Sequence, residues 1–104
     1  PGIRFIDETE GNQPAYYQFA VFLDKVIDIP ELRKRLLSNY RIEAKSIYKP
    51  THAEPLFRKY DRGDLEKTTQ ILVSSLCLPM HPDITRQNAL WIAESLVEEV
   101  RKAN

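Results

Sequence analysis

The sequence predicts an α+β fold, in which helices pack on a small antiparallel sheet of about three strands. Residues 15–23 combine aromatic and β-branched side chains in a run typical of a β-strand. Residues 28–39 and 85–102 instead repeat apolar side chains at about the 3.6-residue period of a helix. Short strand-like and helix-like segments alternate along the 104 residues without an internal repeat. This alternation indicates one small sheet with helices on it.

Length and composition are those of one globular domain. Hydrophobic residues make up 42% of the chain and charged residues 29%, and fifteen basic residues balance fifteen acidic ones. A balanced charge gives no general attraction to nucleic acid or to an anionic membrane. No apolar run is long enough to span a bilayer, nothing resembles a signal peptide, and Cys77 has no second cysteine to pair with. We therefore expect a cytoplasmic protein that binds neither nucleic acid nor membrane.

The N-terminal part of the chain contains one short and one long candidate strand. Residues 3–6 form the short one, and the turn formers Gly11, Asn12 and Pro14 follow it. The run at residues 15–23 is largely apolar on both faces of a strand. We expect this strand to be central or covered on both sides, with an apolar face left for a partner.

A helix start follows at Asp28. Asp28 can serve as the N-cap, Pro30 lies in the first turn, and Glu31 stands three residues after the cap, as in a capping box. The helix is expected to end near Asn39. Its expected buried side chains are Leu32, Leu36, Leu37 and Tyr40.

Residues 41–48 return as a second strand, and a loop braced by Pro50 and Pro55 follows. The side chains expected on one face of this strand are Ile42, Ala44, Ser46 and Tyr48. Three side chains at the strand end and in the loop can bind a ligand by hydrogen bonds or charge: Tyr48, Lys49 and His52. Such a loop is either the rim of a binding site or an ordinary surface connection, and the residues alone leave both open.

The remaining elements complete the predicted alternation. Residues 52–62 are expected to be loop or irregular helix, and Asp64 is expected to cap a helix over residues 65–74. Residues 76–80 form a short strand that Pro79 restricts to an edge or a terminus.

The last helix is expected to start at Thr85 as its N-cap. Its expected apolar stripe is Ala89, Ala93, Leu96, Val97 and Val100. Its expected solvent face is Glu94, Glu98 and Glu99. Trp91 lies away from the stripe.

Several kinds of chemistry are not favoured. The candidate metal ligands His52, His81, Cys77 and Asp83 lack the spacing of a metal site. Cys77 lies in an apolar strand without a cationic neighbour, so we expect a small core residue and not a nucleophile. Basic and aromatic residues mix between residues 45 and 62, but acidic residues dilute them, and a solvated strand edge is favoured over a nucleic-acid site.

Four motifs together resemble one family. Residues 42–57 read I-E-A-K-S-I-Y-K-P-T-H-A-E-P-L-F, which is similar to the I-E-x-R-x-x-W-K-P-x-H-x-x-P-x-F segment of the DegT/DnrJ/EryC1/StrS aminotransferases. Residues 16–19 resemble the family's Y-Y-Q-F/Y strand, residues 32–36 its L-R-x-x-L helix, and residues 76–81 its L-x-L-P-x-H/S strand. The resemblance covers residues 14–102.

The resemblance implies the C-terminal small domain of a fold-type I enzyme that uses pyridoxal phosphate (PLP). Residues 1–13 are then a lead-in from the large domain, and residues 14–104 are the small domain. In this family the large domain holds the PLP-binding lysine and most phosphate contacts, so this chain is expected to carry no catalytic or cofactor-binding residue, to bind no PLP by itself and to be inactive alone. Tyr48, Lys49 and His52 match the W/Y-K-P-x-H positions and are the expected substrate-binding residues.

The implied function is transfer of an amino group, with glutamate as donor, to a nucleotide-linked keto sugar. The implied partners are the nucleotide-sugar substrate, the chain's own large domain and the second subunit of a homodimer. Ala15 and Lys45 replace a His and an Arg that are frequent in the family, which leaves the sugar and the nucleotide open. Two alternatives remain: a free-standing α+β module that binds a ligand or a protein, and a deoxysugar dehydratase of the same family.

Overall fold

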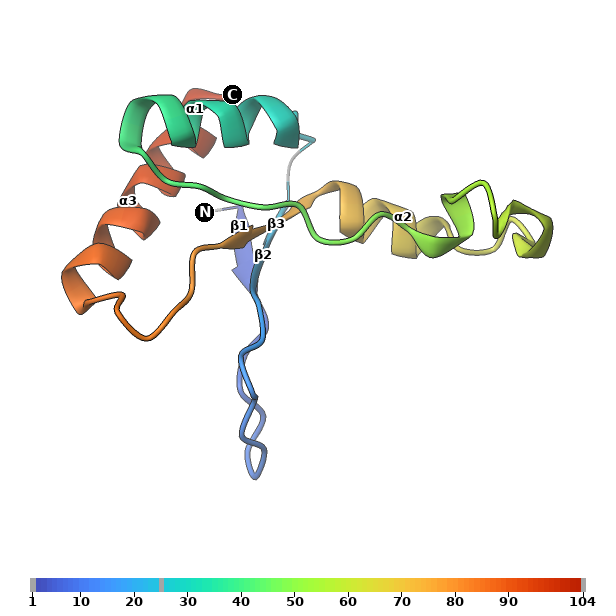
Figure 1. Ribbon diagram of the computed structural model, residues 1–104, viewed down its shortest axis with the longest axis horizontal. Helices are drawn as coiled ribbons and strands as arrows, with labels where there is room; N and C mark the ends of the chain where they lie inside the picture. Colours follow the sequence, from blue (N-terminus) through green and yellow to red (C-terminus); the bar gives the residue numbers. More distant parts are fainter. Residues whose placement is uncertain (1, 25, 104) are drawn as a thin grey trace.

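The computed structural model describes residues 2–24 and 26–103, and it has the predicted α+β architecture (Figure 1). The sheet has three antiparallel strands, β1 (Ile3–Phe5), β2 (Phe19–Leu23) and β3 (Ser75–Leu78), in the order β1-β2-β3. The strand predicted at residues 15–23 is therefore the central one, although only its second half joins the ladder. The short strand predicted at residues 3–6 is also confirmed.

The strand predicted at residues 41–48 is wrong in one respect: it contributes a single bridge and not a ladder. Lys45 and Cys77 exchange two backbone hydrogen bonds, of 2.9 and 2.7 Å. The next pair of this register on one side would join Glu43 to Pro79, and Pro79 has no N–H to donate. The expected alternation holds for Ile42 and Ala44, which are buried, but not for Ser46 and Tyr48, which are exposed. The third strand of the sheet is β1 instead.

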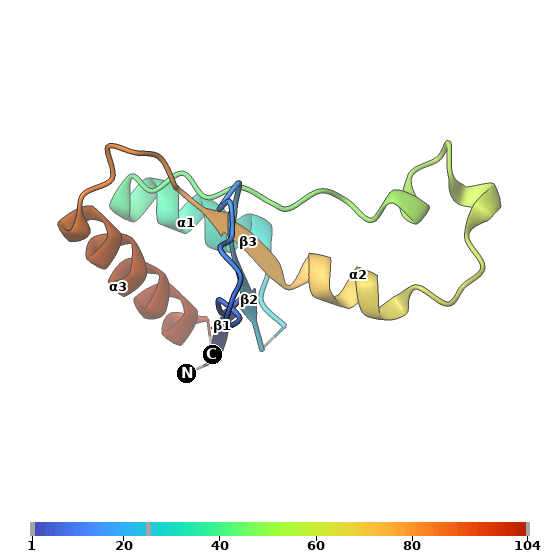
Figure 2. The same ribbon diagram turned by 90° about the horizontal axis from the view of Figure 1, so that it is seen from below.

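The hydrophobic core lies where helices α1 (Ile29–Tyr40) and α3 (Arg86–Lys102) pack together beside the sheet (Figures 1 and 2). In both views, helix α2 (Glu66–Val73) extends away on the opposite side of the sheet. The buried core residues are Val21, Leu23, Ile27, Ile29, Leu32, Leu36, Ile42, Ala44, Leu76, Leu96 and Val100. No helix within the described ranges is both long and apolar enough to span a membrane.

The predicted start of α1 is confirmed. The Asp28 side chain accepts a hydrogen bond of 2.9 Å from the Glu31 N–H. The helix ends at Tyr40, and Arg41 takes a left-handed conformation that closes the C-terminus. Leu37, expected to be buried, is 54% exposed, because it turns away from α3 and the sheet.

Thr85 caps α3 as predicted, in a capping box with Asn88. The predicted stripe is wrong at Ala89 and Ala93, which are exposed. The side chains that are buried in α3 are Ser95, Leu96, Glu99 and Val100, with Ile92 half-buried. Trp91 is half-exposed and packs edge-on against Tyr40, with ring centroids 5.7 Å apart.

Glu99 was expected on the solvent face and is instead completely buried. Its carboxylate accepts hydrogen bonds from Arg35 Nε at 2.8 Å, Lys102 Nζ at 3.1 Å and the Tyr40 hydroxyl at 3.1 Å. Burial raises the pKa of Glu99, but the hydrogen bonds from Lys102, Arg35 and Tyr40 outweigh burial and lower it below its ordinary value. Glu99 can therefore stay charged although it is buried, and its hydrogen bonds to Arg35 and Tyr40 join α3 to α1.

Helix α2 also differs from expectation at its start. Leu65, and not Asp64, is the N-cap residue, and no side chain caps the helix. The predicted irregular region before it contains two short 3-10 helices, η1 (Thr51–Ala53) and η2 (Arg58–Tyr60). Helix α2 has no buried residue.

Two parts of the chain extend from the body of the molecule (Figure 1). They are residues 6–18, which precede β2, and residues 49–73, which include η1, η2 and α2. The radius of gyration is 15.3 Å, whereas a compact chain of this length would have about 13 Å. Exposed apolar side chains gather on and beside these extensions: Phe5, Ile6, Tyr16 and Tyr17 on the first, and Leu56, Phe57, Tyr60, Leu65, Ile71 and Val73 on the second.

Candidate functional site

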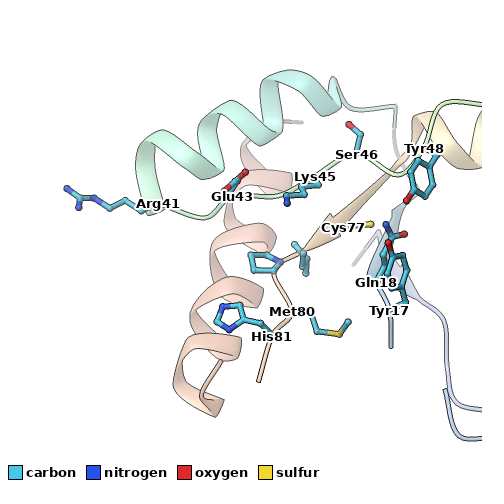
Figure 3. Close-up of a pocket in the computed structure, with 12 residues that line it drawn as sticks. Tyr17, Gln18, Arg41, Glu43, Lys45, Ser46, Tyr48, Cys77, Met80 and His81 are labelled. Carbon is cyan, nitrogen blue, oxygen red and sulfur yellow. The ribbon is translucent and has the colours of Figure 1, made fainter. Parts of the chain in front are cut away.

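A groove of about 760 Å³ runs where residues 41–48 cross the edge of β3 (Figure 3). Its walls come from three separate parts of the chain: the lead-in to β2, residues 41–48, and β3 with the residues that follow it. The lining residues are Tyr17, Gln18, Arg41, Glu43, Lys45, Ser46, Tyr48, Cys77, Leu78, Pro79, Met80 and His81.

One end of the groove is rich in neutral hydrogen-bonding groups. Figure 3 shows Tyr48 pointing towards Gln18 and Tyr17. A hydrogen bond with the Tyr17 hydroxyl raises the pKa of Tyr48 above its ordinary value, so Tyr48 stays a neutral phenol near pH 7. Two phenols and a carboxamide can donate to and accept from the hydroxyl groups of a polar ligand.

The middle of the groove carries charged side chains over an apolar floor, and an imidazole lies at the other end. Glu43 and Lys45 come from the crossing segment, and His81 lies at the far end (Figure 3). Cys77 in the floor is buried, as expected for a small core residue, and burial raises the pKa of its thiol, so it stays protonated at neutral pH. The Arg41 side chain points away from the other lining residues.

The three expected substrate-binding residues lie in different surroundings. Tyr48 lines the groove, but Lys49 and His52 are not among the lining residues. Half-buried His52 in η1 places its Nε2 atom 3.0 Å from the Thr69 hydroxyl of α2. The Thr69 hydroxyl also donates to the Leu65 carbonyl at 3.3 Å. In this structure His52 therefore fastens the loop to α2.

Most of the groove residues could not be recognised as site residues from the sequence. Tyr17, Gln18 and His81 lie inside two of the quoted motifs, and Lys45 lies inside a third. The motifs alone did not show that these side chains meet, because the meeting depends on the long-range pairing of Lys45 with Cys77. The motifs were the only indication in the sequence that these residues belong to a site.

The groove does not fit PLP as a resident cofactor. A phosphate group needs a cradle of free N–H donors, usually at a helix N-terminus or a glycine-rich turn. The three glycines of the chain do not line the groove, and the side chains of Asp28 and Thr85 already cap α1 and α3. Lys45 therefore has no phosphate cradle beside it among the described residues. Within residues 2–24 and 26–103, no group of three or more His, Cys, Asp or Glu side chains gathers as a metal site.

A sequence model of the DegT/DnrJ/EryC1/StrS aminotransferase family matches residues 2–97 of this chain. The chain belongs to this family. The match spans all four motifs quoted above, so the resemblance in the sequence is confirmed. Members of the DegT/DnrJ/EryC1/StrS family are in general PLP-dependent.

The structure of the aminotransferase TlmJ from Streptoalloteichus hindustanus shares the fold of this DegT/DnrJ/EryC1/StrS family chain. The two align with a TM-score of 0.80 at 19% sequence identity, over 97% of this chain. The aligned part is 27% of the TlmJ chain, so this chain spans about a quarter of the length of that structure. A comparison with curated protein sequences found no match.

Proposed function

We propose that this chain is the C-terminal small domain of a PLP-dependent aminotransferase that transfers an amino group from glutamate to a nucleotide-linked keto sugar. The observation that carries the proposal is the family match over residues 2–97. Residues 1–13 lead in from a large domain and residues 14–104 form the small domain. PLP, when bound by the large domain, supplies the electron sink for moving the amino group. The small domain alone is inactive, because it supplies no cofactor-binding lysine.

In this proposal the groove forms the substrate side of the active site. Tyr48 binds the nucleotide sugar at the polar end of the groove beside Tyr17, and Lys49 and His52, which lie outside the groove lining, bind it from the loop that follows. Phenol and amide groups match the hydroxyl groups of a sugar, and Lys45 beside them offers a cation for a phosphate. The residues thus orient the sugar, while the bond-making groups come from the large domain.

The two extensions support the proposed partners. Exposed apolar side chains on a small domain mark surfaces that contact other protein. We assign them to the large domain and to the second subunit of a homodimer. A single buried free thiol and the balanced charge support a cytoplasmic location.

The proposal is tested on the full-length protein. Purified with PLP, it is incubated with glutamate and a nucleotide-linked 4-keto sugar, and the products are identified by mass spectrometry. We expect 2-oxoglutarate and an amino sugar in equal amounts. Loss of a sugar hydroxyl without gain of nitrogen would favour the dehydratase. A coding frame that starts directly before Pro1 would contradict the proposal and favour the free-standing binding module.

A further inference from the structure

The groove wall at residues 41–48 has few backbone ties to the rest of the fold. Its only bridge to the sheet within the described residues is Lys45 with Cys77. Pro79 prevents the next pair on one side. Lys45, Ser46 and Tyr48 nevertheless line the groove from this segment. Besides this bridge and the buried side chains of Ile42 and Ala44, the wall has a further hold from α1.

Arg33 of α1 supplies this hold. Its Nε atom donates to the Ala44 carbonyl at 2.8 Å, and its Nη1 atom donates to the Ser46 hydroxyl at 3.0 Å. The two acceptors flank Lys45, the residue that bridges to Cys77. The rigid fork of a guanidinium suits two acceptors spaced along an extended chain, whereas the single ammonium of a lysine does not.

The surroundings of Arg33 leave it free for this role. Arg33 is half-buried, and the described part of the chain places no carboxylate within ion-pair distance of it. The two basic residues next to Arg33 in the sequence have other partners: Lys34 lies near Glu31, and Arg35 binds Glu99. Arg33 itself does not line the groove.

We propose that Arg33 is a positioning residue for the groove, which fixes the wall so that Lys45 and Tyr48 face a bound nucleotide sugar. The ligand class in this inference rests on the proposed function, whereas the hold on the wall does not. Because the wall contacts parts of the substrate that do not react, its loosening weakens binding more than it slows turnover.

The test uses the full-length protein with Arg33→Ala, Arg33→Lys and Ser46→Ala, and with Lys34→Ala as the matched control. Lys34→Ala removes a cation from the same helix without touching the wall. Amide hydrogen exchange at Lys45 and Cys77 measures how often the bridge between the wall and β3 opens. Calorimetry with UDP-glucose and dTDP-glucose measures ligand binding. Steady-state kinetics of the amino transfer then separate KM from kcat.

We expect Arg33→Ala to speed exchange at both amides and to raise the dissociation constant and KM about tenfold, with kcat changed less than twofold. Arg33→Lys, which keeps the charge and most of the length of the side chain, should recover part of this loss of binding. Ser46→Ala, which removes only one of the two acceptors, should show a smaller loss. Lys34→Ala should match the wild type.

Unchanged exchange in both Arg33 variants would show that the residue does not hold the wall. Faster exchange with unchanged binding would show that the wall does not position the ligand. If the wild type binds neither probe nor transfers an amino group, the proposed function fails on its own, and the inference that the wall serves a nucleotide sugar falls with it.

Discussion

The buried carboxylate of Glu99 should contribute strongly to the stability of the domain. Glu99 is 0% exposed and accepts from Arg35, Lys102 and Tyr40, so it joins α1 to α3. Breaking a fully buried pair costs about 3–5 kcal/mol. The Arg35 and Lys102 side chains keep 31% and 54% of their exposure and can rehydrate, so we expect Glu99→Ala to cost about 2–3 kcal/mol. Glu99→Gln keeps the shape and should cost less.

The assay is urea unfolding of the 104-residue chain, followed by circular dichroism. With a slope of about 1–2 kcal/mol per molar urea, the loss lowers the midpoint by about 1–3 M. Glu98→Ala is the control, because exposed Glu98 also pairs with Lys102, at 2.6 Å, and should shift the midpoint only slightly. Equal midpoint shifts for Glu98→Ala and Glu99→Ala would show that burial does not increase the contribution of Glu99 to the free energy of unfolding.

Three further predictions follow from the same structure. Because the pKa of Glu99 is lowered in the folded state, its stabilisation is present above its unfolded pKa of about 4.3 and is lost as the pH falls through the folded pKa. Acid should therefore destabilise the wild type more than Glu99→Gln in urea titrations, and parallel pH profiles would contradict this. Thr69→Val should remove the hydrogen-bond partner of His52 Nε2 and change the tautomer balance of the His52 ring in ¹⁵N NMR, whereas Thr69→Ser should not; an unchanged balance would show that Thr69 does not set the tautomer. In the full-length protein, Lys49→Ala and His52→Ala should each raise the KM for the nucleotide sugar several-fold with little change in the cofactor absorbance. An unchanged KM in both variants would remove these residues from the substrate site.

The local signals of the sequence predicted the fold well. Asp28 and Thr85 cap their helices as expected, because a cap depends on residues within one turn. The second half of the apolar run before Leu23 became the central strand, because it pairs with β1 along one edge and with β3 along the other. The sequence motifs also predicted the family.

The errors concern features that depend on distant partners. The periodicity of α3 could not show that Arg35 and Tyr40 of α1 would surround Glu99 and make its burial favourable. The alternation at residues 41–48 predicted a shared buried face correctly for Ile42 and Ala44 but not for Ser46 and Tyr48, which are exposed. The register that places Pro79 opposite Glu43 depends on residues outside the segment. The groove forms from three segments that lie far apart in the sequence. The motif in each segment was visible in the sequence, but the long-range contacts that bring the segments together were not.

The most direct test of the account is a two-step measurement of the PLP absorbance in the full-length protein. Glutamate alone should change the absorbance, and a nucleotide-linked keto sugar added afterwards should restore it. Tyr48→Phe should slow the second step and leave the first unchanged, because Tyr48 lies on the substrate side of the groove. No absorbance change with glutamate would contradict the aminotransferase, and equal rates in wild type and Tyr48→Phe for both steps would contradict the role of this groove.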